Sequence, residues 1–191
     1  MFDKTLSPFA KPLLSKMAIY AVKIGVSADA VSILGFITGI VAAFLVGYGH
    51  FLLALLFFCL NRILDGLDGA IARVKTPTHR GAFLDIVFDF IIYSSIPFAF
   101  AVFNDKNSFV ACFIIFSFVG TGTSFLAYGI LQEKISKKNK KPTGEKSFYY
   151  LSGLIEGSET IFFIVLILSV SISIFLYWNC LWLLVLVHHN I

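Results

Sequence analysis

Long apolar stretches separated by short polar ones dominate the chain. Six of them lie at residues 30–49, 51–73, 82–103, 108–131, 152–170 and 171–187. Each is near the roughly 20 residues that a helix needs to cross a hydrocarbon core about 30 Å thick. The pattern therefore predicts six membrane-spanning helices, although no turn residue separates the last two.

A different periodicity precedes the first of these stretches. Over residues 12–25 the apolar side chains recur at helical spacing, namely Leu13, Met17, Tyr20, Ala21 and Ile24. Lys16 and Lys23 fall on the other side of such a helix. An amphipathic helix that leads directly into a membrane span is expected to lie in the membrane interface.

The composition agrees with this pattern. Of the 191 residues, 58% are hydrophobic and 14% are charged, whereas a typical soluble domain has about 25% charged residues. This excludes a soluble globular protein, a disordered chain and a disulfide-stapled secreted domain. We expect an all-α polytopic membrane protein that forms a single domain over residues 1–191.

The formal charge of +4 indicates topology rather than a nucleic-acid partner. With six spans, 13 of the 15 lysines and arginines fall on one side of the membrane. Lys106 falls on the other side, and Arg62 lies inside the second stretch. Because basic residues are retained on the cytoplasmic side, we expect both termini there.

Four carboxylates lie inside apolar stretches, toward their cytoplasmic ends: Asp65, Asp68, Asp85 and Asp89. A charge at mid-membrane costs roughly 2.5–3.5 kcal/mol on insertion scales, so something must offset four of them. The spacings i, i+3 and i, i+4 place each pair on one helix face, and a short connection makes the two helices antiparallel neighbours. Facing carboxylate pairs suit Mg²⁺ or Mn²⁺. The alternative is an ion-pair network with Arg62 and Arg73 that has no chemical role.

Small residues surround these acids, namely Gly66, Gly69, Ala70 and Ala72. A wall with so few side chains admits a bulky ligand such as a nucleotide, whose phosphates Arg73 would meet. Close packing between helices explains the same small residues without any ligand.

Taken together, the residues from Asp65 to Asp89 resemble the signature of the CDP-alcohol phosphotransferase family, D-x2-D-G-x2-A-R, a spacer, then G-x3-D-x3-D. The chain matches all eight positions, and its spacer, residues 74–80, is one residue shorter than the usual form. The six spans and the interfacial first helix also look like this family.

The resemblance implies a role for each matching residue. Asp65, Asp68 and Asp85 would be metal ligands, and Asp89 would be the general base and a further ligand. Gly69, Ala72 and Arg73 would line the nucleotide site, with Gly81 and Thr78 close by. Asp29 would help to hold the nucleotide; capping the first span is an equally good explanation of Asp29.

The implied reaction moves a phosphatidyl group from a CDP-linked donor, typically CDP-diacylglycerol, to the hydroxyl of a small acceptor alcohol, and CMP leaves. Its place would be the inner membrane of a prokaryote, with the site on the cytoplasmic side. A homodimer is also expected from the family. Gly35 and Gly39 would serve either that dimer or an internal helix contact.

Three other functions fit part of the pattern. A UbiA-type prenyltransferase also uses intramembrane aspartates, but its two motifs lie far apart. A cation transporter would explain the acids but neither the small residues nor Arg73. The chain could also be a paralogue that has lost the activity, but its complete set of four aspartates argues against this. The acceptor stays open: Glu156 and Glu159 would bind an amine or polyol, or would only favour a helix start.

Overall fold

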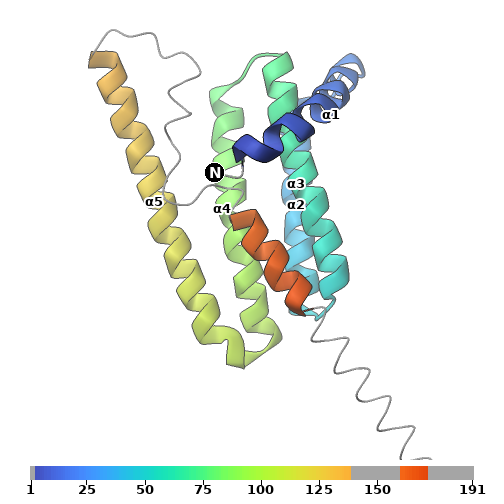
Figure 1. Ribbon diagram of the computed structural model, residues 1–191, viewed down its shortest axis with the longest axis vertical. Helices are drawn as coiled ribbons and strands as arrows, with labels where there is room; N and C mark the ends of the chain where they lie inside the picture. The colour runs from blue at the N-terminus through green and yellow to red at the C-terminus, as the bar shows by residue number, and fades with distance from the viewer. Residues whose placement is uncertain (1–2, 139–159, 172–191) are drawn as a thin grey trace, which may run out of the picture.

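The computed structural model describes residues 3–138 and 160–171, and all of their regular structure is helical. In chain order the elements are α1 (Asp3–Lys23), α2 (Ala28–Gly47), α3 (Phe51–Val74), α4 (His79–Phe103), the 3₁₀ turn η1 (Asp105–Asn107), α5 (Ser108–Lys138) and a helix Thr160–Ser171. Helices α2 to α5 run up and down beside one another, and α1 lies across one end of this bundle (Figure 1).

Three helices in this part of the chain are long and apolar enough to cross a membrane: Ala28–Gly47, His79–Phe103 and Asp105–Leu131. Helix α3 has 24 residues and is long enough, but it carries too many charged side chains to meet the same criterion. The all-helical class is therefore confirmed, while the count of six spans stays a prediction. Residues 152–159 and 172–187 of the expected last two spans lie outside the described residues.

Several helices extend beyond the predicted stretches. Helix α1 begins at Asp3, before the predicted start at residue 12. Helix α5 continues to Lys138, although its stretch that is apolar enough to cross a membrane ends at Leu131, as predicted. Helix α4 begins at His79 instead of residue 82, because the Thr78 side chain accepts a hydrogen bond from the Gly81 N–H at 3.0 Å and caps the helix. The last described helix includes Ser171, which was expected to begin the next span.

Helix α1 packs against the bundle through small side chains. Ala18 and Ala21 are buried in a cluster with Val31 of α2 and with Ala70 and Ile71 of α3. Among the described side chains of α1, four larger apolar ones remain exposed, namely Leu13, Met17, Ile19 and Tyr20, and Ile24 just after the helix is exposed too. This exposed face suits the membrane interface, and its location there stays a prediction.

The Gly35–Gly39 pair is used inside the molecule. A Cβ atom on Gly35 would lie 3.4 Å from Leu64 Cβ of α3. A Cβ atom on Gly39 would touch Ile92 Cδ1 of α4, and it would lie 2.8 Å from Ile92 Cγ1. Glycine therefore lets α2 approach α3 and α4 closely, and this answers the choice left open by the sequence in favour of the internal contact.

Gly39→Ala is expected to lower the free energy of unfolding by about 1–3 kcal/mol, the usual cost of overpacking. Ile92 is 1% exposed, so it has little room to move aside. The added Ile92→Val change removes the Cδ1 atom that the new methyl group meets, and it should restore part of the loss. Thermal unfolding in detergent measures both effects. Gly120→Ala is the control, since no atom lies within 4 Å of its new Cβ; equal losses in Gly39→Ala and Gly120→Ala would contradict the packing argument.

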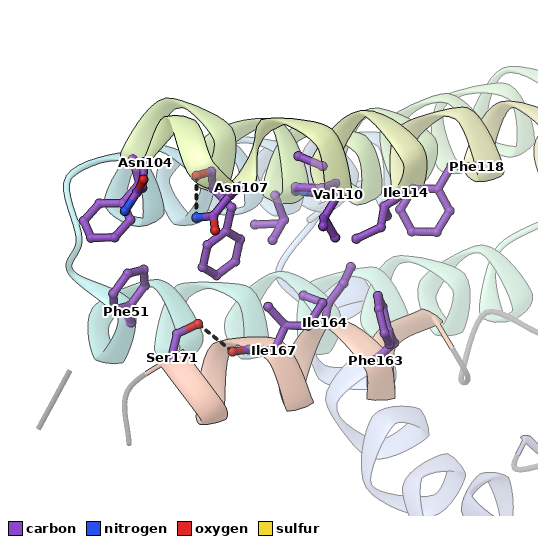
Figure 2. Close-up of a pocket in the computed structure, with 15 residues that line it drawn as sticks. Phe51, Asn104, Asn107, Val110, Ile114, Phe118, Phe163, Ile164, Ile167 and Ser171 are labelled. Carbon is purple, nitrogen blue, oxygen red and sulfur yellow. Dashed lines mark hydrogen bonds between the residues drawn. The ribbon is translucent and has the colours of Figure 1, made fainter. Parts of the chain in front are cut away.

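A cavity with a volume of about 530 Å³ lies at the other end of the bundle from α1. Figure 2 shows Phe51, Ile114 and Phe163 around it, with Asn104 and Asn107 at one edge. None of the four membrane aspartates lines this cavity. Its lining is mostly apolar, so it offers little polar chemistry.

Candidate active site

Helices α3 and α4 bring three of the four aspartates together. One carboxylate oxygen from each of Asp65, Asp68 and Asp85 can be chosen so that all three lie within 4.8 Å of one another. Asp65 and Asp68 share a face of α3 because they are three residues apart, and Asp85 approaches them from α4. The expected convergence of the two helices is present.

This cluster suits a small divalent cation. All four aspartates line a pocket of about 10 Å³ together with Ser32 and Asn61, and this volume is close to that of one water-sized particle. Carboxylate oxygens are the ligands that Mg²⁺ and Mn²⁺ prefer. Phe36 and Phe88, which also line the pocket, stack with ring centroids 4.3 Å apart and cover one side of it with apolar surface.

Asp89 lies at the same pocket but has other partners. Its Oδ1 atom is 2.8 Å from Arg62 Nη2, and its Oδ2 atom accepts a hydrogen bond from the Tyr93 hydroxyl at 3.1 Å. Asp89 does not belong to the group of three converging carboxylates. Its expected role as a metal ligand therefore stays a prediction, whereas its separate position suits a proton acceptor.

Sequence reasoning did not find the surroundings of Asp89. It placed Arg62 inside a span as a counter-charge for the four aspartates without choosing one of them, and it did not consider Asn61 or Tyr93. The spacing held the signal, because Tyr93 is four residues after Asp89 and Arg62 is three residues before Asp65. Both spacings put side chains on one helix face, where they can meet.

Gly69 and Arg73 lie one helical turn apart at the end of α3. A Cβ atom on Gly69 would lie 3.4 Å from Arg73 Nη1, so the guanidinium folds back over the glycine. Arg73 is exposed and Ala72 is half-buried. An exposed guanidinium above a bare backbone is well placed to meet a phosphate group.

The other expected nucleotide residues gather where α2 and α4 begin. A Cβ atom on Gly81 would lie 3.1 Å from Thr78 Oγ1 and 3.7 Å from Asp29 Oδ1. Asp29 does not cap α2, because that role belongs to Ser27, whose side chain accepts from the Ala30 N–H at 3.2 Å. Asp29 instead forms an ion pair with Arg80, with 3.4 Å between Oδ2 and Nε.

Helix directions place these groups at one end of the bundle. Helix α3 runs opposite to α2 and α4, so its last turn lies beside their first turns. Lys75, just after α3, donates a hydrogen bond to the Val26 carbonyl oxygen at 3.0 Å and ties the two ends together. Fold and site thus define an integral membrane protein with a carboxylate-rich polar site at one end of an apolar helical bundle.

Comparison with known proteins gives the family. The family model for CDP-alcohol phosphatidyltransferase matches residues 26–188. The inner membrane protein YnjF of Escherichia coli (strain K12) is 42% identical over 167 residues, which are 87% of this chain and 81% of YnjF. No solved structure gives a significant match. The chain belongs to the CDP-alcohol phosphatidyltransferase family, and phosphatidyl transfer is its reaction class.

Proposed function

We propose that this protein transfers a phosphatidyl group from CDP-diacylglycerol to the hydroxyl of a small acceptor alcohol and releases CMP. The observation that carries the proposal is the meeting of Asp65, Asp68 and Asp85 at one end of an apolar bundle, with Asp89 beside them in the same pocket. Family membership supplies the reaction class.

In this proposal the three converging aspartates hold Mg²⁺ or Mn²⁺. When bound, such a cation supplies charge stabilisation for the diphosphate and for the leaving group. Among the described residues, Arg62 is the cation that pairs with these four carboxylates, so an excess of negative charge remains and favours cation binding. Arg73 meets the donor phosphates over Gly69 and Ala72, while Asp29, Thr78 and Gly81 form the other wall of the nucleotide site.

Asp89 is the proton acceptor in the proposed reaction. The acceptor hydroxyl gives its proton to the Asp89 carboxylate, and its oxygen attacks the phosphorus that carries the diacylglycerol. The bond between that phosphorus and the bridging oxygen breaks, so the electron pair leaves with CMP. A positioned carboxylate of this kind contributes about 100- to 10,000-fold to a rate.

The membrane explains the position of the site. The acyl chains of the donor stay in lipid beside the apolar outer faces of the helices, while its CDP head enters at the bundle end. We place this end on the cytoplasmic side of an inner membrane, because the basic residues flank it and because YnjF is named an inner membrane protein.

The nature of the acceptor depends on the cations near the site. Two exposed basic residues at this bundle end already have partners, since Arg80 pairs with Asp29 and Lys75 with the Val26 carbonyl oxygen. A phosphorylated acceptor that binds to Arg80 or Lys75 would have to separate one of these pairs, whereas an uncharged alcohol would not. Glu156 and Glu159, the other expected acceptor groups, lie outside the described residues.

Purified protein in detergent should release CMP from CDP-diacylglycerol when Mg²⁺ or Mn²⁺ and the right acceptor are present. Phosphorylated and unphosphorylated alcohols are offered one at a time, and CMP is measured by chromatography. EDTA should abolish the release, and added Mn²⁺ should restore it, because the carboxylate cluster needs a cation. Folded protein that binds neither CDP nor Mn²⁺ would overturn the proposal.

A further inference from the structure

Arg62 is a buried cation whose role the family signature leaves open. Its side chain lies near the middle of α3 and is only 10% exposed. The guanidinium carbon lies 5.6 Å from the centre of the Phe58 ring and 5.1 Å from that of Tyr93. A guanidinium between two aromatic rings is restrained by packing and by its attraction to both ring faces.

A hydrogen-bond chain fixes the orientation of this guanidinium. Arg62 Nε donates to Asn61 Oδ1 at 2.7 Å, and Asn61 Nδ2 donates to the Gly35 carbonyl oxygen of α2 at 2.8 Å. Asn61 is 2% exposed, so water competes little for these bonds. The guanidinium is thus anchored to α2 through Asn61.

The other edge of the guanidinium holds Asp89. Nη2 lies 2.8 Å from Asp89 Oδ1, while Nη1 donates to the Tyr93 hydroxyl oxygen at 2.8 Å. The Tyr93 hydroxyl donates in turn to Asp89 Oδ2 at 3.1 Å. Both oxygens of Asp89 therefore have a partner. The contact between Arg62 Nη1 and Asp65 Oδ2 is longer, at 3.7 Å.

We infer that Arg62 is a positioning residue that holds Asp89 apart from the three converging aspartates, so that Asp89 accepts the proton of the acceptor hydroxyl instead of joining the metal ligands. Tyr93 completes the arrangement by fixing the second carboxylate oxygen. The inference rests on the proposed function, since it assigns Asp89 the role of base in that reaction.

Arg62→Met tests this directly, because methionine fills a similar volume without charge or hydrogen bonds. The kcat for CMP release should fall about 100-fold, the lower range for loss of a working base. The KM for CDP-diacylglycerol should stay nearly unchanged. Mn²⁺ should bind more tightly in an electron paramagnetic resonance titration, because a positive charge is gone and Asp89 is free to join the ligands. A merely structural role would weaken Mn²⁺ binding together with turnover.

Arg62→Lys and Arg62→Met/Asp89→Asn sharpen the result. Lysine keeps the charge but lacks the planar fork, so it should restore the original Mn²⁺ affinity without restoring kcat. If Arg62 acts through Asp89, the double variant should be no slower than Asp89→Asn alone. Losses that multiply in the double variant would overturn the inference. Lys106→Met, which removes an exposed charge at the opposite end, is the control.

Tyr93→Phe provides a second variant if Arg62→Met does not fold. It removes only the hydroxyl group that bonds to Asp89 and should lower kcat about tenfold, within the range for one lost hydrogen bond to a charged group. Tyr48→Phe, at an exposed tyrosine, is its matched control. No CMP release by the wild type with any acceptor counts against the proposed function. A wild type that turns over while Arg62→Met and Tyr93→Phe match it overturns only the positioning role.

Discussion

Asp68→Ala is expected to abolish CMP release, with a loss of about 1,000-fold or more, because it removes a carboxylate on which metal binding and charge stabilisation depend. Asp68 is the most deeply buried of the three converging aspartates, at 5% exposure. A water molecule that took its place would supply an oxygen ligand but no negative charge. Mn²⁺ affinity should therefore fall together with turnover.

The measurement combines CMP release with an Mn²⁺ titration of the same preparation. Asp105→Asn is a matched control, because Asp105 lies in the exposed η1 turn, away from the pocket. A thermal unfolding curve shows whether Asp68→Ala is folded. Unchanged Mn²⁺ affinity in folded Asp68→Ala would exclude Asp68 from the metal site.

Asp89→Asn is expected to lower kcat by about 100- to 10,000-fold, the range for loss of a general base, while CDP still stabilises the protein against heat. The amide keeps the shape of the carboxylate but cannot accept the proton of the acceptor hydroxyl. Mn²⁺ binding should be affected far less than in Asp68→Ala, because Asp89 stands outside the group of three converging carboxylates.

Comparison of the two variants separates binding from chemistry. Asp68→Ala should lose metal affinity and turnover together, whereas Asp89→Asn should lose mainly turnover. If Asp89→Asn releases CMP at the wild-type rate, the proton must go to another acceptor. Equal loss of Mn²⁺ affinity in both variants would instead make Asp89 a fourth ligand.

The convergence of Asp65, Asp68 and Asp85 could be predicted because helical spacing alone determines which residues share a face. A short connection then leaves two neighbouring helices little freedom except to run antiparallel. The same reasoning did not reveal Arg62 as a partner of Asp89, since this contact depends on the rotation of α3 against α4. That rotation is set by packing in the core that Phe58 of α3 shares with Ile92 and Ile96 of α4.

Helix ends were harder to predict than helix positions. The start of α4 depends on a single hydrogen bond, from the Gly81 N–H to Thr78 Oγ1, and hydropathy does not register such a bond. Asp29 shows the same difficulty, because Ser27, two residues earlier, provides the cap. In both cases a local polar contact decided what the apolar pattern left open.

The charges of α3 have a consequence for biogenesis. Helix α3 carries four charged residues, namely Arg62, Asp65, Asp68 and Arg73. Its insertion into the lipid bilayer by itself is unfavourable, since each such charge near the helix centre costs roughly 2.5–3.5 kcal/mol. Only residues 48–50 separate α3 from the strongly apolar α2, and Asn61 bonds to the Gly35 backbone across the pair. The two helices should therefore enter the bilayer together as a hairpin. The favourable insertion of α2 would then offset the cost of inserting the charged residues of α3.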